Sequence, residues 1–358
     1  MFYKVVGLMS GTSLDGLDIA CVDFWEENNS WSFRLTHATT IEFQFDLLSK
    51  LENVRNHTAW ELTLLDLELG SFFGKSVSAF LESNHIDKSS IHLIASHGHT
   101  VFHQPQNRVT LQIGKGQEIA RITGIQTVNN FREKDVLYGG QGAPLVPIGD
   151  RDLFAKTDQF DALINLGGFA NITILKDHKI NAFDICPCNL VLNKYSKILG
   201  FPFDKDGAFG KQSKSQNSDL LSRLNALPHF KMNQPKSLGA EWIEAEFYPI
   251  LDSHNSSAQD KIGVCYEVIS DQIAAVLEQE EIRNVLVSGG GAKNKHLIEL
   301  IEKKCSAKIT VPSKDIIDFK EAIIFAYLGV LFMENKPNCL SEVTHASQDL
   351  VGGVLYRP

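Results

Sequence analysis

The stretch Gly7-Leu-Met-Ser-Gly-Thr-Ser-Leu-Asp-Gly-Leu-Asp18, GLMSGTSLDGLD in one-letter code, stands between two apolar runs near the start of the chain. The run KVVGLM is β-prone, and LDIACVDF alternates apolar and polar positions. This pattern predicts a β-hairpin over residues 3–24, with a loop longer than a tight turn needs. The small, hydroxyl and carboxylate residues of that loop therefore need a separate explanation.

Two later segments repeat this combination of an apolar strand and a glycine-rich turn. In DALINLGGFANITILKD, a strand over residues 162–166 meets Gly167-Gly168, the polar Asn171 follows, and ITIL continues as a second strand. In RNVLVSGGGAKNKHLIELIEKK, a strand is followed by Ser288 and three glycines, and then by an amphipathic helix. The sequence thus predicts two hairpins and one strand–loop–helix unit.

The three glycine-rich loops together predict a nucleotide site. One such loop alone is commonly turn chemistry, since glycine adopts positive φ without steric penalty. Two hairpin tips with converging backbone N–H groups suit phosphate oxygens, however, and a glycine loop that opens a helix lets a flat ligand approach the backbone. Neither GxxxxGK[ST] nor GxGxxG occurs in these loops, so neither a P-loop nor a Rossmann site is supported. The residues predicted to bind nucleotide are Gly11, Thr12, Ser13, Leu14, Asp15, Gly16, Leu17, Asp18, Gly167, Gly168, Asn171, Gly289, Gly290 and Gly291.

Length and composition set the broad class. With 358 residues, the chain is long enough for two domains or for one large α/β unit. A net charge of −9 and 43% hydrophobic residues indicate a soluble globular protein and argue against nucleic acid or anionic membrane as a partner. The sequence shows neither a membrane-spanning run nor a secretory leader, and its six cysteines are too irregular for a disulfide framework. We therefore expect reduced thiols and a cytoplasmic protein.

The duplicated hairpins lie about 160 residues apart, which indicates an internally doubled architecture. Nine blocks occur in one order along the chain: GLMSGTSLDGLD (7–18), ASHGHTVFHQP (95–105), LQIGKGQEIARITGI (111–125), VNNFREKDVLYGGQGAPLVP (128–147), INLGGFANIT (164–173), FDICPCN (183–189), VSGGGAKN (287–294), EAIIFAYL (321–328) and VTHAS (343–347). In these blocks the chain resembles the anhydro-N-acetylmuramic acid kinase family, within the actin, Hsp70 and sugar-kinase superfamily.

The resemblance implies an α/β fold of the actin-like ATPase type, in which two related ribonuclease H-like domains hold ATP in the cleft between them. We expect domain I to comprise residues 1–127 and 336–358, and domain II to comprise residues 128–335. Members of the family take 1,6-anhydro-N-acetylmuramic acid, ATP with Mg²⁺ and water, and give N-acetylmuramic acid 6-phosphate and ADP in peptidoglycan recycling. A homodimer is also expected.

Opening the anhydro ring needs a carboxylate that takes a proton from the attacking water. Asp184 is the candidate, because it follows the apolar-leaning INAF, precedes Pro187 and comes shortly after the second hairpin. An aspartate at a strand end also commonly forms a cap or a turn, but the resemblance implies a catalytic base here. The family pattern DTGPGN reads DICPCN in this chain, so Cys186 and Cys188 replace two glycines. Two thiolates one residue apart do not complete a zinc shell, and we expect no metal there.

Three other carboxylates are candidates for the site. Asp15 and Asp18 lie in or just beyond the first loop, where they either form Asx turns or hold Mg²⁺, with water between carboxylate and metal. Glu321 is expected to open the helix EAIIFAYLGVLF, where it either complements the helix dipole or contacts the substrate.

The remaining candidates are expected to line the sugar pocket. His97, Gly98 and His99 belong to the block ASHGHT; with His103 they form H-x-H-x₃-H, whose spacing is not that of a helical metal pair. Arg132, with Lys134 as the alternative, is a predicted partner for the lactyl carboxylate, because its guanidinium forms bidentate contacts. The block GGQGAP contributes Gln141 and Pro144 and is too rich in glycine for regular structure.

Two other functions remain open at this stage. Another sugar kinase of the superfamily would share the nucleotide loops but would use its carboxylate to deprotonate a sugar hydroxyl, without consuming water. A non-catalytic ATP-dependent clamp would keep the loops but would not need Asp184, GGQGAP and the histidine block. The presence of those three features favours the anhydro-sugar kinase.

Overall fold

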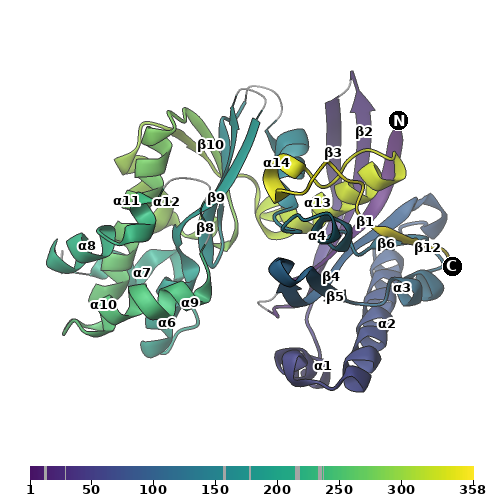
Figure 1. Ribbon diagram of the computed structural model, residues 1–358, viewed down its shortest axis with the longest axis horizontal. Helices are drawn as coiled ribbons and strands as arrows, with labels where there is room; N and C mark the ends of the chain where they lie inside the picture. Colours follow the sequence, from purple (N-terminus) through teal and green to yellow (C-terminus); the bar gives the residue numbers. More distant parts are fainter. Residues whose placement is uncertain are drawn as a thin grey trace. The chain divides into compact units, whose positions relative to one another are not determined.

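The protein consists of two compact units in a computed structural model that describes residues 1–11, 14–28, 30–155, 159–176, 179–213, 218–232, 236 and 238–358. Unit 1 comprises Met1–Phe154 and Phe319–Pro358, and unit 2 comprises Ala155–Asp318 (Figure 1). The boundaries expected at 127/128 and 335/336 therefore differ from those of the compact units. The reason is that residues 127–129 form a strand inside the sheet of unit 1, and a long helix through residues 319–333 packs on the same sheet.

Unit 1 is built on a seven-stranded sheet with the order β12-β6-β4-β1-β2-β3, in which β5 also pairs with β4. Its strands are β1 (Phe2–Ser10), β2 (Leu17–Glu27), β3 (Ser30–Ile41), β4 (Leu93–Gln104), β5 (Val109–Ile113), β6 (Thr127–Asn129) and β12 (Val354–Tyr356). Its helices are α1 (Phe45–Glu52), α2 (Ala59–Ser83), α3 (Gly116–Thr123), α4 (Glu133–Leu137), α5 (Val146–Gly149), most of α13 (Lys314–Met333) and α14 (Ser341–Thr344). The predicted first hairpin is confirmed, since β1 and β2 pair antiparallel from Phe2 to Met9.

The alternation along β1 sends successive side chains to two different helices. Val6 and Leu8 enter the cluster that α2 covers. Gly7 faces α13 instead, where a Cβ atom would collide with the carbonyl oxygen of Ala322. This close approach is why a glycine stands inside the strand.

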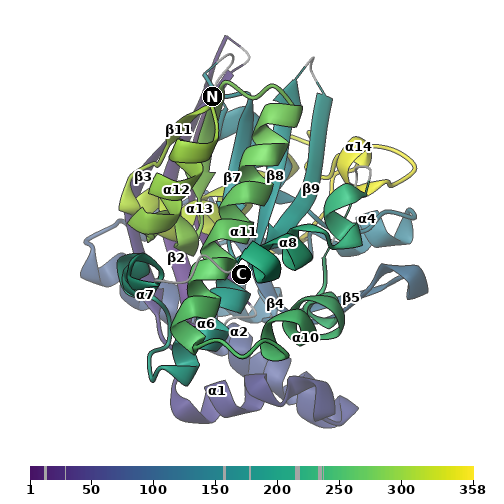
Figure 2. The same cartoon turned by 90° about the vertical axis from the view of Figure 1, so that its left-hand side faces the viewer.

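Unit 2 is built on a five-stranded sheet with the order β11-β10-β7-β8-β9. Its strands are β7 (Ala162–Leu166), β8 (Phe169–Lys176), β9 (Lys179–Pro187), β10 (Asn284–Ser288) and β11 (Lys308–Thr310). Its helices are α6 (Asn189–Ile198), α7 (Ala208–Gln212), α8 (Ser218–Asn225), α9 (Ala240–Trp242), α10 (Tyr248–Asp252), α11 (Ala258–Gln279) and α12 (Lys295–Lys304). Figure 2 shows α11 lying across one face of β7 and β8, where its apolar side chains share a core with those of the sheet. The predicted second hairpin and the strand–loop–helix unit are both confirmed.

The two sheets repeat one topology, which confirms the predicted α/β fold with a doubled architecture. In each unit, three strands that follow one another along the chain pair antiparallel, and two further strands then add parallel on the other side of the first. The corresponding orders are β3-β2-β1-β4-β6 and β9-β8-β7-β10-β11. In both units the glycine-rich hairpin connects the first strand to the second.

Three further findings bear on the sequence predictions. All six cysteines are free thiols, and five of them are buried, as expected. No helix in the described part of the chain is long and apolar enough to cross a membrane. The prediction that Glu321 opens a helix is wrong, because α13 already begins at Lys314; the preceding residues KDIIDFK continue the helical pattern toward the N-terminus. Glu321 therefore lies too far from the helix start for a dipole role.

Candidate active site

A row of polar side chains crosses the sheet of unit 2. Asn165 on β7 lies opposite Asn171 on β8, which in turn lies opposite Asp184 on β9, and Ser288 on β10 is in register with Asn165. Residues directly opposite one another in a sheet share a face. Their strand neighbours Ile164, Ile172, Phe183 and Val287 belong to the core with α11, so the polar row lies on the opposite face. The strand pairing thus brings together Asn171 and Asp184, which the sequence placed in separate motifs.

Asp184 is partly buried and has one occupied carboxylate oxygen. The backbone N–H of Leu238 donates to Oδ2 at 2.8 Å, and the backbone N–H of Asp184 donates to the carbonyl oxygen of Lys236 at 3.0 Å. No hydrogen bond from the described residues reaches Oδ1, which leaves this oxygen able to accept a proton. Burial raises the pKa of the Asp184 carboxyl above its usual range, against the lowering effect of the Leu238 N–H. Asp184 lies within β9 and does not cap a turn.

Asn165 is a candidate that the sequence reasoning missed. A Cβ atom on Gly289 would come within 2.5 Å of the Asn165 side-chain oxygen, and one on Gly167 within 3.2 Å of its nitrogen. The Asn165 amide therefore lies between the second hairpin and the loop after β10. A polar residue at an alternate position of the otherwise apolar strand ALINL was the signal that could have identified it.

The three glycines after β10 have different structural reasons. Gly289 adopts φ +83° beside Asn165, and a Cβ atom on Gly291 would come within 2.7 Å of the Leu166 side chain. Close packing on the second hairpin thus accounts for both. Gly290 is exposed, and a side chain there would find its nearest heavy atom, Asn189 Nδ2, at 3.8 Å. Gly290 is therefore the position of this loop that is open to a ligand.

The second hairpin turn consists of Gly167 and Gly168. Their carbonyl groups accept hydrogen bonds from backbone N–H groups at the start of α6. The backbone N–H of Cys188 donates to the Gly168 carbonyl at 2.8 Å, and that of Asn189 donates to the Gly167 carbonyl at 3.1 Å. Cys186 and Cys188 are fully buried, and burial raises the pKa of the Cys188 thiol to about 12. Both side chains therefore belong to the core, and φ of Cys188 is −130°, so the turn does not need glycine there.

In unit 1, the first loop shows which predicted residues are accessible. Leu14 has a positive φ of 61°, and Asp15 is exposed. Gly16 has φ +145° and lies against the Ile41 carbonyl, while the Leu17 side chain is fully buried in the core. Gly11, which accepts the Leu14 N–H, is half-buried, and the predicted Thr12 and Ser13 lie outside the described residues. Of these described residues, Asp15 has the most accessible side chain.

Asp18 lies inside β2, opposite Thr40 of β3. The Thr40 hydroxyl donates to Asp18 Oδ1 at 2.5 Å. This bond fixes the carboxylate at the end of the first loop. It does not form the Asx turn that the sequence allowed as an alternative.

His97 and His99 are buried and hydrogen-bonded within the protein. Arg132 Nε donates to His97 Nε2 at 3.1 Å, so the proton lies on Nδ1, which contacts the Gly98 carbonyl at 2.9 Å. Burial and the Arg132 charge hold the pKa of His97 well below its usual range. His99 Nδ1 pairs with the Ser10 hydroxyl at 3.0 Å. His97 is thus a neutral side chain whose two ring nitrogens both have protein partners.

Arg132 links His97 to the glycine loop. Its Nη1 donates to the Gly142 carbonyl at 2.7 Å. Gln141 and Pro144, in the same loop, are exposed. The Glu321 side chain is exposed. Desolvation raises the pKa of its carboxyl, and the nearby positive charges of Lys320 and Arg132 partly offset this rise.

The family model and the related sequences agree with one another. The family model described as Anhydro-N-acetylmuramic acid kinase matches residues 3–358. A relative with that name from Shewanella amazonensis is 35% identical over 98% of this chain and 98% of its own length. One from Vibrio vulnificus is 34% identical over 98% of this chain and 97% of its own length. The chain belongs to the anhydro-N-acetylmuramic acid kinase family. Among solved structures, component A of the Acidaminococcus fermentans (R)-2-hydroxyglutaryl-CoA dehydratase aligns over 90% of this chain and 96% of that one, with a TM-score of 0.47 and 12% identity, too low to inform function.

A kinase of this family needs groups that bind a phosphoryl donor and position an acceptor. The described residues contain no cluster of three or more His, Cys, Asp or Glu side chains that could hold a metal ion. Mg²⁺ commonly keeps several waters and uses one or two carboxylates, and Asp15 with Asp18 fits that smaller requirement.

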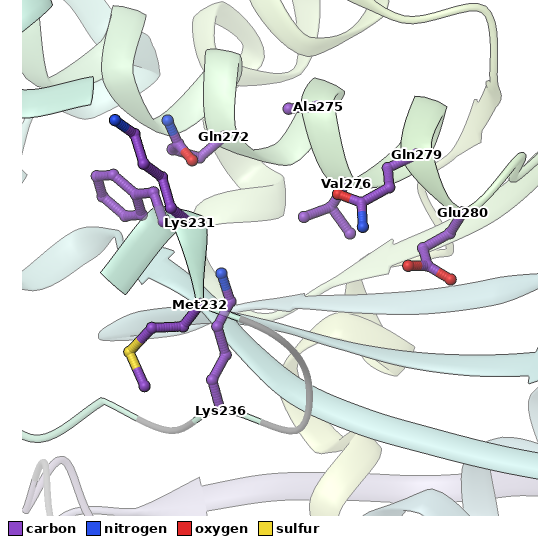
Figure 3. Close-up of a pocket in the computed structure, with 9 residues that line it drawn as sticks. Lys231, Met232, Lys236, Gln272, Ala275, Val276, Gln279 and Glu280 are labelled. Atoms are coloured by element: carbon purple, nitrogen blue, oxygen red, sulfur yellow. The ribbon is translucent and has the colours of Figure 1, made fainter. Parts of the chain in front are cut away.

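A pocket of about 370 Å³ lies elsewhere in unit 2 of this kinase (Figure 3). Its lining comes from the second half of α11 and from the segment that leads toward residue 236, and includes Lys231, Lys236, Gln272 and Gln279. None of the predicted site residues lines it. Among the described residues, the pocket meets the polar row only through Lys236, whose carbonyl accepts the Asp184 N–H.

Proposed function

We propose that the protein uses ATP to convert 1,6-anhydro-N-acetylmuramic acid into N-acetylmuramic acid 6-phosphate and ADP, with hydrolytic opening of the anhydro ring, in peptidoglycan recycling. Family membership supports the substrate class. The observation that carries the ring-opening step is the Asp184 carboxylate, which has one oxygen fixed by a backbone N–H and the other without a partner among the described residues.

The reaction balances around one base and one phosphoryl donor. Water forms a bond to the anomeric carbon while the bond between that carbon and O6 breaks, and Asp184 takes the proton of the water. The freed O6 receives the γ-phosphoryl group as its bond to ADP breaks, so no separate acid is needed to protonate O6. Burial raises the pKa of Asp184, which increases its strength as a base.

Other residues take supporting roles in this proposal. In unit 2, Gly167 and Gly168 with Asn171 receive phosphate groups, and Gly290 leaves space for the adenosine between Gly289 and Gly291. In unit 1, the backbone of the first loop also contacts phosphate. The sugar is contacted by the set Gly98, His99, Gln141, Pro144 and Glu321, while His97 and Arg132 act through their bonds to the surrounding backbone.

Mg²⁺ is part of the proposed reaction, held by Asp15 and Asp18 through water. When bound, the ion offsets negative charge on the phosphates of ATP. The Asp18 carboxylate is oriented by the Thr40 hydroxyl and the Asp15 carboxylate is exposed, and a water-mediated Mg²⁺ site needs direct contact from neither. The cytoplasmic location and the homodimer stay predictions.

The test is a single incubation of the protein with anhydro-sugar, ATP, Mg²⁺ and ¹⁸O water, followed by mass spectrometry. We expect one ¹⁸O atom at the anomeric position at early times, before exchange through the open-chain form, and phosphate at O6. A phosphorylated product that keeps its anhydro bridge would show a sugar kinase without ring hydrolysis. ATP turnover without any sugar phosphate would exclude both.

A further inference from the structure

The glycine loop at residues 140–142 is fixed through its backbone by Asp135, just before it in the sequence, and by the distant Thr344. The Gly140 N–H donates to the Asp135 carbonyl at 2.9 Å, the Gln141 N–H to the Thr344 carbonyl at 2.7 Å, and the Gly142 N–H to Asp135 Oδ2 at 2.7 Å. Every N–H of the loop is therefore paired. The Gly142 carbonyl is also occupied, by Arg132.

Asp135 is the centre of this network and has no exposed surface. Besides the Gly142 N–H, its carboxylate accepts the Thr344 hydroxyl at 2.6 Å on Oδ1. A Cβ atom on Gly140 would collide with Asp135 Oδ2, so the carboxylate fills the space that a side chain there would need. A buried carboxylate with two donors and a guanidinium nearby is strongly oriented, and loss of a donor leaves a costly unpaired acceptor.

Thr344 belongs to α14, in the C-terminal block VTHAS that the sequence analysis singled out without giving it a role. This segment also contacts the residues just before the loop, since the Ser347 N–H donates to the Tyr138 carbonyl at 3.1 Å. More than 200 residues of sequence separate the two segments, so no local pattern shows that they meet.

The Gln141 side chain is what this arrangement leaves available. It is exposed and forms no hydrogen bond to the described residues, while its backbone is held on both sides. We propose that Asp135 and Thr344 are positioning residues for the sugar, which hold the loop so that the Gln141 amide contacts the substrate. This inference rests on the proposed function, because it takes Gln141 as a sugar contact.

The test compares Thr344→Val, which keeps the shape but removes the hydroxyl, with Thr344→Ser, which keeps it. We expect Thr344→Val to raise KM for the anhydro-sugar roughly fivefold or more and to change KM for ATP less than twofold. Thr344→Ser keeps the hydroxyl, so its KM for the anhydro-sugar should stay close to that of the wild type. Ser341→Ala is the matched control, because it removes a hydroxyl bond to Asp349 in the same segment without touching the loop, and it should leave both constants unchanged.

A double-mutant cycle separates positioning from general stability. In a Gln141→Ala background, Thr344→Val should raise the sugar KM no further, because the side chain that it positions is gone. Additive effects of the two substitutions would overturn the inference. So would a parallel rise of both KM values that tracks a lowered melting temperature.

Amide hydrogen exchange gives a readout that does not need the sugar reaction. Thr344→Val should speed exchange across residues 139–143 relative to Thr344→Ser, because the Asp135 carboxylate loses one of its restraints. Unchanged exchange there overturns the positioning role even if the enzyme is active. Faster exchange in a protein that phosphorylates no sugar supports the restraint and places the failure in the proposed function.

Discussion

The two sheets share one strand order but differ in the state of the carboxylate that each presents. Asp18, on the second strand of unit 1, lies beside Thr40, whose hydroxyl bonds to it at 2.5 Å. Asp184, on the third strand of unit 2, lies beside Asn171 and receives one backbone N–H. A cross-strand partner thus orients Asp18, whereas Asp184 has a raised pKa and, among the described residues, one oxygen without a hydrogen bond. In the proposed function, one topology thus carries the carboxylate that orients Mg²⁺ in one unit and the base in the other.

The largest expected effect comes from Asp184→Asn. The substitution keeps an oxygen for the Leu238 N–H but cannot take a proton, so the single-turnover rate should fall by roughly 10²–10⁴. Affinities for sugar and ATP and the melting temperature should change little. A rate within about threefold of wild type is too small a loss for a general base, and would remove Asp184 from the centre of the mechanism.

The pH profile of kcat/KM tests the same carboxylate. The base works in its ionised form, so activity should fall as pH decreases through the pKa of Asp184, which burial raises above its ordinary value of 3.8. The acid limb should therefore lie above that value in the wild type, and the residual activity of Asp184→Asn should lack it. A variant that keeps the same acid limb would assign the limb to another group.

The next effect should come from Gly290→Val, compared with Gly291→Ala. Gly290 faces open space, so the valine should weaken ATP binding about tenfold or more by steric conflict with the ligand, with an unchanged melting temperature. Gly291 packs on Leu166, so its alanine should lower the melting temperature. Calorimetric titration and thermal unfolding measure the two effects. Equal ATP affinity in Gly290→Val and wild type would mean that the loop acts only as a turn and does not contact the nucleotide.

Asp18→Asn should have a smaller effect, on the metal requirement. We expect the Mg²⁺ concentration for half-maximal rate to rise about fivefold, with the sugar KM within twofold of wild type. Thr40→Val is the control, because it removes the orienting hydroxyl and keeps the charge; its shift should be smaller. An unchanged Mg²⁺ dependence in Asp18→Asn would give the carboxylate a structural role on β2 and remove it from the proposed metal site.

The smallest effect is expected from Cys186→Ala combined with Cys188→Ala. Both thiols are buried in the core, and burial raises their pKa values, so we expect them to act neither as nucleophiles nor as metal ligands. Activity below the melting temperature should stay within about twofold, although the melting temperature falls with the lost packing. Stoichiometric zinc in the wild-type protein, or loss of activity in the folded variant, would contradict this.

The sequence by itself determined the local elements. Strand alternation and turn residues are short-range signals, so both hairpins and the strand–loop–helix unit near Ser288 were predictable, and so was the doubled α/β fold. The start of α13 was predicted wrongly, because the helix was expected to begin with the apolar run EAIIFAYL, whereas the more polar residues before it are also helical. That all six cysteines are free thiols was predictable from their number and irregular spacing alone.

Only the tertiary structure decided which residues meet. Strand register places Asn165 and Asn171 in one row with Asp184, and packing on Leu166 explains two glycines that the sequence assigned to the ligand. Burial makes His97 a neutral side chain bonded to Arg132, and the fold joins Asp135 to Thr344 across more than 200 residues. Register and burial depend on long-range packing, whereas hairpin and helix signals are local, so the sequence indicated the parts of the site but not how they connect.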